Sequence, residues 1–251
     1  MGKIILAVVV IIALILLIGG IRACNAIEKY NIAAAAYNEI VDGYNAVAYN
    51  SGVENIAGVP AQIGLIRTEK ETFWEGLKVV VGKNTIKKIK KDTETIYQLI
   101  EQTKVSLIII EQIKDPAEEW VGSRLQSVSG VTGIQAVTKN NNPDGLLGKD
   151  GGYKACLYFT CRGIDPDLIP GSDIVAKGVG AGGSIEVYST VEEAEARCEY
   201  LAGFDGTVLY SGSYAIVGTM VIRTSYKLSN EEQITLTDAI TQALTAIESR
   251  S

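Results

Sequence analysis

The longest apolar run of the chain lies at its start. Residues 4 to 21 read IILAVVVIIALILLIGGI and contain no charge and no side-chain amide. A helix of this length spans roughly 27 Å, close to the hydrocarbon thickness of a bilayer. The run therefore predicts a transmembrane helix that anchors the chain. The alternatives are a signal peptide cleaved after Ala26, although the run is longer than usual for one, and a lipoprotein signal at Cys24, where Arg22 is a poor neighbour.

Two later segments repeat apolar residues at alternating spacings of three and four, the pattern of helices that pack along a seam. The first seam is Ile27, Tyr30, Ala34, Tyr37, Val41, Tyr44 and Ala48, and the second is Ile86, Ile89, Thr93, Ile96, Ile100, Thr103, Leu107 and Ile110. We expect an antiparallel helical hairpin over residues 24 to 114, a stalk in which each seam buries the other. The alternative is a homo-oligomer, a parallel dimer through the same seams.

Residues 51 to 83 join the two seams. Their first part, SGVENIAGVPAQIG, predicts a loop, and TEKETFWEGLKVVVG predicts a short amphipathic helix that caps the hairpin. The lysines at 87, 88, 90 and 91 would then lie near the tip of the hairpin. We expect them to form a solvated helix face; the alternative is contact with an anionic polymer or a membrane surface.

The remainder of the chain alternates between short strand-like and helical patterns. Strands are expected at IQAVT, KACLYFT, SIEVYS, GTVLYS and YAIVGTMVIRTS. Helices are expected over 116–127 with Asp115 as N-cap, after Thr190, and from Ser229 to about 248, the last two with a Glu at the capping-box position. The order helix, three strands, helix, two strands, helix predicts an α+β head over residues 115 to 251, an antiparallel α+β sandwich domain.

Charge and composition exclude several function classes. The net charge is −6, and residues 116 to 251 carry 10 Lys and Arg against 17 Asp and Glu. We therefore expect no nucleic-acid partner, because phosphate neutralisation needs clustered cations. The chain has no histidine, which removes Ser-His-Asp and Cys-His nucleophile systems and the commonest transition-metal ligand. No cofactor is expected.

The four cysteines contain no CxxC pair, which argues against a zinc site. Small, buried, reduced side chains are the simplest interpretation. The alternative is a disulfide between Cys161 and Cys198, if the head faces an oxidising space.

Residues 139 to 152, KNNNPDGLLGKDGG, contain a partial calcium-loop pattern. Asn140, Asn142 and Asp144 occupy positions 1, 3 and 5 of an EF-hand loop, but position 12 is Gly151 where a bidentate Glu is needed. The stretch is also not a phosphate-binding Walker loop, since Asp150 follows Lys149. Asn, Pro, Asp and Gly together predict a tight turn. The alternative is a weak hard-cation site formed by Asn140, Asn142 and Asp144.

Three further patterns have a functional and a structural interpretation. Gly178, Gly180 and Gly183 satisfy GxGxxG, but a strand follows where a dinucleotide site needs a helix. The carboxylates Asp165, Asp167, Asp173, Glu186 and Asp205 offer a catalytic pair for glycoside hydrolysis or simply surface charge. The tyrosines of the head suit a binding surface for sugar or peptide, or the packing of strands: Tyr153, Tyr158, Tyr188, Tyr200, Tyr210, Tyr214 and Tyr226.

The stretches NPDGLLGKDGGY, IEVYSTVEEAEARCEYLAGFDG and YSGSYAIVGTMVIRTS resemble a head region that recurs in membrane-anchored proteins of low-GC Gram-positive bacteria. Some of those proteins carry a label borrowed from extracellular matrix-binding proteins. The resemblance covers residues 115 to 245 and implies one N-terminal span, a helical segment, a head of this kind and placement at the cell surface. It brings no catalytic residues.

We expect a single-pass protein of the cell membrane with an extracytoplasmic body. Its expected role is non-enzymatic binding of a protein or a cell-wall polymer. The alternatives are a structural or sensory accessory that acts through stalk oligomerisation, and a cell-envelope hydrolase that uses paired carboxylates.

Overall fold

The computed structural model describes residues 2–48, 85–208 and 210–247. The helices of the described residues are α1 (Gly2–Ala48), α3 (Thr85–Gln112), α4 (Glu118–Gln126), α5 (Ile174–Lys177), α6 (Val191–Ala202) and α7 (Asn230–Thr245), with short 3-10 helices η1 (Pro166–Leu168) and η2 (Gly178–Ala181). The strands are β1 (Val131–Ala136), β2 (Ala155–Cys161), β3 (Gly182–Val187), β4 (Tyr214–Val217) and β5 (Met220–Thr224). The expected loop and short helix over residues 51 to 83 lie outside the described residues.

The described residues fall into two compact units. The helical unit contains α1 up to Asn45 and α3 up to Val105, and the head unit contains the last three residues of α1 and the chain from Ser106 onward. The head unit is a mixed α+β fold, as the sequence predicts.

Helix α1 runs without interruption from the apolar run into the first seam. The large apolar side chains between Val9 and Ile21 point outward; Ile15 is 61% exposed and Leu14 is 50% exposed. Such side chains are unfavourable in water and suited to lipid. Helix α1 is long and apolar enough to cross a membrane, by its length and composition.

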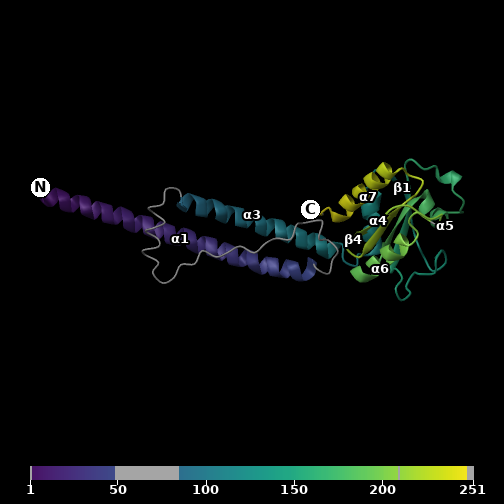
Figure 1. The fold of residues 1–251 in the computed structure, drawn as a ribbon, viewed down its shortest axis with the longest axis horizontal. Helices are drawn as coiled ribbons and strands as arrows, with labels where there is room; N and C mark the ends of the chain where they lie inside the picture. Colours follow the sequence, from purple (N-terminus) through teal and green to yellow (C-terminus); the bar gives the residue numbers. More distant parts are fainter. Residues whose placement is uncertain (1, 49–84, 209, 248–251) are drawn as a thin grey trace. The chain divides into compact units, whose positions relative to one another are not determined.

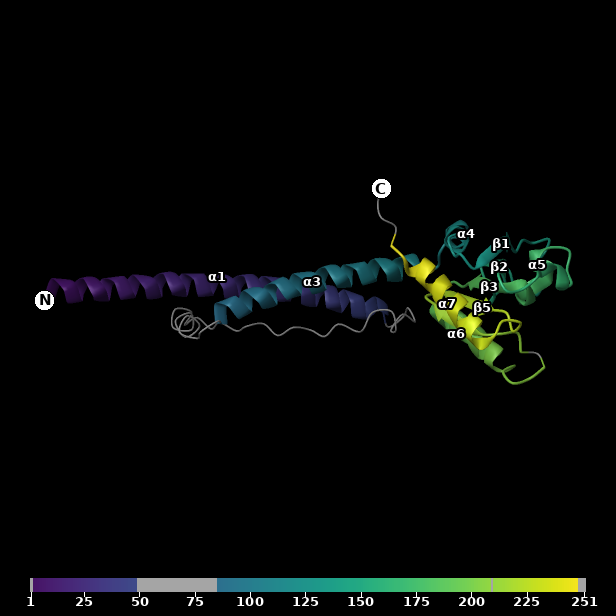
Figure 2. The ribbon, with the colours of Figure 1, turned by 90° about the horizontal axis from the view of Figure 1, so that it is seen from above.

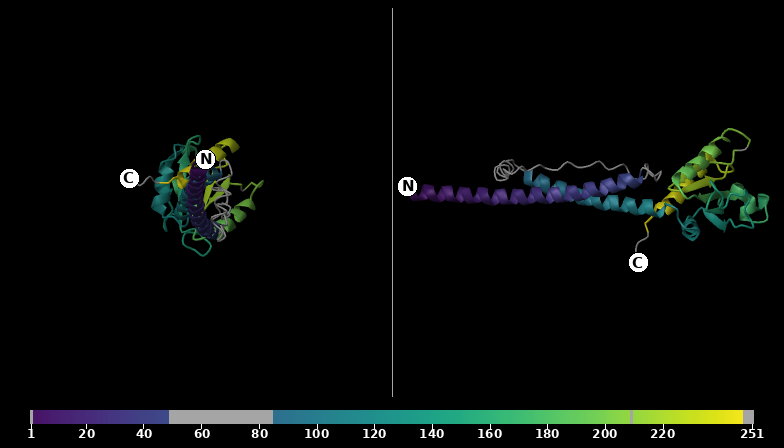
Figure 3. Two further views of the ribbon diagram at one scale, coloured as in Figure 1. Left: turned by 90° about the vertical axis from the view of Figure 1, so that its left-hand side faces the viewer. Right: turned by 90° about the horizontal axis from the view of Figure 1, so that it is seen from below.

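The two predicted seams bury each other, but the helices run in the same direction. Near its start the pair packs Ala26 and Ile27 against Ile89. Further along both helices, Tyr37 lies in one cluster with Ile96. Figure 1, Figure 2 and Figure 3 show α1 and α3 side by side with their C-terminal ends pointing the same way. The expected antiparallel hairpin is therefore wrong.

The reason for this error is that a seam of alternating three and four spacings looks the same in either direction. Apolar periodicity selects the face of a helix and contains no information about the orientation of its partner. The polar members of the second seam do not favour either orientation of the partner helix. Thr93 and Thr103 donate their hydroxyls to the carbonyls of Ile89 and Leu99 within the same helix, each at 2.8 Å.

A crosslinking experiment distinguishes the two orientations. Cysteines placed by Ile27→Cys and Ile89→Cys are expected to form an intramolecular disulfide on mild oxidation, because these side chains pack in one cluster. The combination of Ile27→Cys with Leu107→Cys, which an antiparallel hairpin would bring together, is expected to remain reduced. The readout is mobility on a non-reducing gel in a background that lacks Cys24. Rapid formation of the second disulfide would contradict the parallel pair.

The head unit is built on one antiparallel sheet with the strand order β1-β2-β3-β5-β4, of which Figure 2 labels β1, β2, β3 and β5. Strand β3 lies at its centre, where Glu186 is opposite Cys156 of β2 and Val221 of β5. All residues of β2 and β3 are buried, which requires cover on both faces of the sheet.

Helices cover both faces. On one face α4 and α7 pack together against the sheet, with Gly122 of α4 close to Leu157. On the other face lie α5 and α6, and there Ala194 and Leu201 of α6 join Cys156 and Tyr158 in one buried cluster. The side chains that the central strands direct to either face of the sheet are therefore mostly apolar, apart from the polar residues described below.

The last two strands differ from the expected ones. The described residues of the stretch GTVLYS do not form a strand, and Val208 is fully exposed. Instead YAIVGTMVIRTS folds back on itself, with Val217 opposite Met220. Gly218 has φ 60°, a conformation that favours glycine, and it makes the tight reversal within a run that reads as one long strand.

The expected helix starts are partly confirmed. Ser229 and Glu232 form a complete capping box at α7, and Thr190 accepts from the amide of Glu193 at α6. Asp115 is not the N-cap of α4; that position is Ala117. Asp115 has φ 50°, donates its amide to Thr219, and pairs its carboxylate with Lys154 at 2.6 Å.

Candidate functional site

The central strand of the head unit has a buried charge on the α6 face. Glu186 of β3 is 0% exposed in an otherwise apolar strand environment. An unpaired carboxylate there would cost several kcal/mol or more, so its charge must be compensated. The compensation comes from one residue on β5 and one on α6, which are distant in sequence.

Four donors surround the Glu186 carboxylate. Arg197 on α6 donates from Nε to Oε2 at 2.7 Å and from Nη2 to Oε1 at 3.0 Å. Arg223 on β5 donates from Nη1 to Oε1 at 2.9 Å, and the hydroxyl of Tyr188 donates to Oε2 at 2.8 Å. Bidentate and charge-assisted bonds of this kind are among the stronger hydrogen bonds in proteins. One carboxylate thus holds two guanidinium groups in place.

The pKa values of this cluster follow from that arrangement. Burial disfavours the charged form of Glu186, but the hydrogen bonds and positive charges of Arg197 and Arg223 outweigh it and lower its pKa. Burial also raises the pKa of Tyr188, and the neighbouring Glu186 adds to the shift. At neutral pH the cluster therefore consists of one carboxylate, two guanidinium groups and a neutral phenol.

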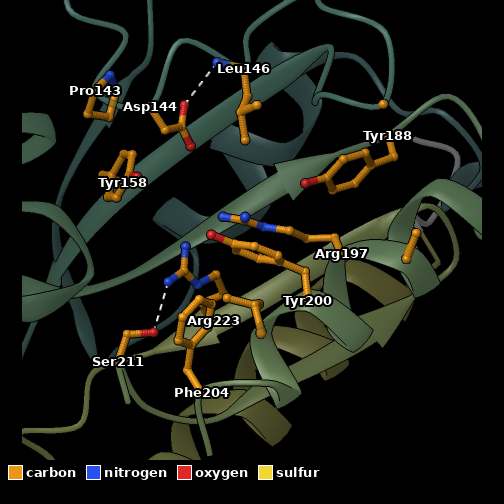
Figure 4. Close-up of a pocket in the computed structure, with 13 residues that line it drawn as sticks. Pro143, Asp144, Leu146, Tyr158, Tyr188, Arg197, Tyr200, Phe204, Ser211 and Arg223 are labelled. Carbon is orange, nitrogen blue, oxygen red and sulfur yellow. Dashed lines mark hydrogen bonds between the residues drawn. The ribbon is translucent and has the colours of Figure 1, made fainter. Parts of the chain in front are cut away.

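A pocket of about 790 Å³ opens above this cluster. In Figure 4 the side chains of Arg197 and Tyr200 come from α6, and that of Arg223 comes from β5, toward the same hollow. The pocket is lined by Pro143, Asp144, Leu146, Gly151, Tyr158, Tyr188, Ala196, Arg197, Tyr200, Leu201, Phe204, Ser211 and Arg223. Its walls are largely aromatic and apolar, and its charged members are Arg197, Arg223 and Asp144.

The two guanidinium groups are held on several sides. Arg223 also donates from Nη2 to the hydroxyl of Ser211 at 2.9 Å. The Arg197 guanidinium lies over the ring of Tyr200, with 5.4 Å to the ring centroid, and Tyr200 packs edge-on against Phe204. Because both arginine side chains are 12% exposed, they are fixed in orientation while part of each still faces the pocket.

A buried hydroxyl without a partner lies beside the pocket. Ser184 of β3 is 0% exposed, and among the described residues its Oγ has no hydrogen-bond partner. In the sheet, Ser184 is opposite Tyr158 of β2 and Arg223 of β5. Because residues directly opposite each other point to the same face, Ser184 lies on the same face as these two pocket residues. Buried polar atoms are normally satisfied, so this hydroxyl, which does not itself line the pocket, is an exception within the sheet.

The loop with the partial calcium-loop pattern, residues 139 to 152, forms one wall of this pocket through Pro143, Asp144 and Leu146. The hydroxyl of Tyr153 lies 2.6 Å from Asp144 Oδ1 and 3.1 Å from Asn142 Oδ1, so these two oxygens share one donor. The tight turn is present: Gly145, like Gly148 and Gly151, has a positive φ.

Asn140, the third residue of the suggested cation site, is an exposed residue of the same loop. No group of three or more His, Cys, Asp or Glu residues within the described residues is arranged to hold a metal ion. The weak hard-cation site at Asn140, Asn142 and Asp144 stays a prediction.

All four cysteines are free thiols. Cys161 belongs to the β2 row that faces α4 and α7, whereas Cys198 packs against the cluster on the α6 face. The sheet lies between them, so the suggested disulfide is not formed. Burial raises the pKa of Cys161 and of Cys198 to about 11, which keeps both thiols protonated and unreactive at neutral pH.

The other candidates have structural roles. Asp165 caps η1 and Asp173 caps α5 through backbone amides, and Asp205 accepts a hydrogen bond from Tyr214. In the glycine-rich stretch, a Cβ added at Gly183 would lie 2.2 Å from the carbonyl oxygen of Arg223. That glycine therefore allows β3 to approach its neighbours closely.

Glu186, Tyr158, Tyr188 and Tyr200 are among the candidate residues that the sequence offers, whereas Arg197 and Arg223 are not. The available signal was a charge inside each of two strand patterns, SIEVYS and MVIRT, which predicts a buried partner. Sequence alone does not say which charges meet.

No protein-family model matches the chain. No curated protein and no solved structure matches it either. The resemblance to surface proteins of Gram-positive bacteria therefore remains an expectation from the sequence.

Proposed function

We propose that this chain is a membrane-anchored, single-pass protein whose head unit binds an anionic ligand in the pocket above Glu186. The observation that carries the proposal is the pair of guanidinium groups that share one buried carboxylate at an aromatic pocket. The two guanidinium groups together carry one positive charge more than the Glu186 carboxylate offsets, and Asp144 is the one carboxylate among the residues that line the pocket. Arginine recognises carboxylate and phosphate groups through its planar fork of donors.

The aromatic walls define the rest of the ligand. Tyr200 is 60% exposed and stands beside Arg197, where it offers a face for a flat or apolar group. A few placed polar groups in a mostly apolar hollow are typical of small-ligand sites. The ligand class is thus a carboxylate or phosphate attached to a flat or apolar part, either as a small molecule or as an end group of a protein or cell-wall polymer.

The geometry favours binding over carboxylate catalysis. A general acid needs a raised pKa, whereas the pKa of Glu186 is lowered and its oxygens accept four hydrogen bonds from the protein. Glu186 is better suited to orient the arginines than to transfer a proton.

Cell-membrane placement with an extracytoplasmic body remains part of the proposal. The apolar surface of α1 supports the membrane anchor. The seam residues that could have formed a homodimer are buried within the chain; Tyr37 is 2% exposed and Val41 is 0% exposed. This burial supports binding by the head over a role based on oligomerisation through the seams.

Phenyl phosphate is a suitable probe because it combines an anion with a flat ring. We expect it to bind the full chain in nanodiscs more tightly than inorganic phosphate or phenol, as measured by isothermal titration calorimetry. Tyr200→Ala is expected to weaken binding roughly fivefold, because one aromatic or cation–π contact contributes about 1 kcal/mol.

The matched control for this experiment is Tyr226→Ala. Tyr226 is also exposed, at 52%, and also stands beside a cation, Lys227, but it does not line the pocket. Its replacement is expected to leave the affinity unchanged. Equal affinities of the wild type and Tyr200→Ala, or no binding of phenyl phosphate, would overturn the proposed site.

A further inference from the structure

The parallel packing of α1 and α3 brings two groups of cations together. Arg22 and Lys29 of α1 line one hollow of about 410 Å³ with Lys90 and Glu94 of α3. An antiparallel hairpin would instead have placed the start of α3 at the far end of α1. The lysines at the start of α3 therefore lie beside the residues that directly follow the apolar run.

We define the basic collar as Arg22, Lys29, Lys87, Lys88, Lys90 and Lys91. All six side chains are exposed. The acidic residues of the same two segments are Glu28, Asp92 and Glu94, so the collar has an excess of three positive charges. In the rest of the described helical unit the exposed charged residues are mainly acidic: Glu39, Asp42, Glu101 and Lys104.

The collar lies at the depth of lipid headgroups if the apolar run spans the membrane. Arg22 follows residue 21 directly, and Lys29 is only about 11 Å further along the helix axis. The attraction between a cation and an anionic bilayer surface falls off within a Debye length, about 10 Å. Lys90 lines the same hollow as Arg22 and Lys29, so the start of α3 shares their distance from the apolar run.

We propose that the basic collar binds the headgroups of anionic phospholipids in the leaflet from which residue 22 emerges. This inference rests on the membrane anchoring proposed above, and it assigns a role to the start of α3 that is independent of the pocket in the head. Lysines at this distance from the surface attract anionic lipids without a specific pocket. Contacts from two helices would hold the helical unit against the membrane on two sides.

The test uses the full chain in vesicles of phosphatidylcholine with a minor fraction of phosphatidylglycerol. Electron spin resonance of spin-labelled lipids measures the relative association of the two headgroups with the protein. The wild type is expected to prefer phosphatidylglycerol by about threefold or more at low salt. The preference is expected to decline toward unity in high salt, because the collar is exposed to solvent.

The variant Lys87→Gln, Lys88→Gln, Lys90→Gln, Lys91→Gln is expected to lose most of the preference. Its matched control makes the same change in charge elsewhere, at the exposed residues Lys104, Lys114, Lys139 and Lys149, and is expected to keep the preference. Circular dichroism verifies that both variants retain their helices.

The outcomes separate the two proposals. A chain that does not float with the vesicles overturns the membrane anchor and the collar together. A chain that floats but shows no preference for phosphatidylglycerol, or loses it equally in both variants, overturns the collar and leaves the anchor intact. If a variant fails to fold, the wild type alone still tests the collar, because its preference for phosphatidylglycerol must decline in high salt.

Discussion

Replacement of Glu186 by glutamine is expected to lower the free energy of unfolding of the head unit by about 3–5 kcal/mol, the usual effect of removing one partner from a buried ion pair. The carboxylate is 0% exposed and accepts from two guanidinium groups. Glutamine has nearly the same shape but no charge, so Arg197 and Arg223 would be left close together without compensation. Urea unfolding of the full chain, followed by tryptophan fluorescence, measures the change.

Glu199→Gln is the matched control, because Glu199 is an exposed residue on the same helix as Arg197. It is expected to change the free energy of unfolding by no more than about 0.5 kcal/mol. A loss below about 1 kcal/mol for Glu186→Gln would contradict the view that this ion cluster is needed to assemble the α6 face.

Acidification gives an independent check of the same cluster. The pKa of Glu186 is lowered in the folded state, so its ionised form contributes stability at pH values above its unfolded pKa. That contribution is lost as the pH falls through the folded pKa. The stability difference between the wild type and Glu186→Gln is therefore expected to be largest at neutral pH and to decrease in acid.

Deletion of residues 2 to 21 is expected to move the protein from the membrane fraction to the soluble fraction. From Val9 onward the deleted part presents large apolar side chains outward, with Ile15 61% exposed and Ile18 49% exposed, which suits a lipid environment. Cell fractionation with an alkaline carbonate wash measures the change, since peripheral proteins are released by the wash.

A pair of point variants provides a matched control for the deletion. Ile15→Lys places a charge in the middle of the apolar run, where the insertion penalty is about 2.5–3.5 kcal/mol. Ile32→Lys makes the same change on the same helix at a residue that is also 61% exposed but lies beyond the run. The first is expected to weaken membrane retention and the second is not. Retention of the deletion variant in the washed membranes would contradict the anchor.

Much of the local structure could be predicted because it depends on neighbouring residues. The helix starts at Ser229 and Thr190 follow from side-chain oxygens three residues before a free amide. The reversal at Gly218 was missed because its flanking residues are apolar on both sides and read as one continuous strand. A single glycine in such a run is a weak turn signal, and only the pairing of Val217 with Met220 reveals it.

The candidate site was less accessible to prediction. Glu186 is one of five candidate carboxylates in the sequence of the head, and its significance comes from Arg197 and Arg223, which lie 11 and 37 residues further along the chain. Nothing in the local pattern of α6 indicates that Arg197 points inward, because a helix with many charges usually presents them to solvent. The sheet register and the position of α6 together bring the three charges to one place.

The sequence by itself determined the apolar N-terminal run, the two helical seams, the α+β composition of the head and most helix starts. These features depend on periodicity and on contacts between near neighbours, which the order of residues specifies directly. Only the tertiary structure decided the direction in which α3 packs on α1, the splitting of the last strand, and the meeting of Glu186 with two arginines. Each of these depends on which surfaces, distant in sequence, pack against each other. Because the hydrophobic effect has no preferred direction, that pairing is determined by the fold of the whole chain and not by a local pattern.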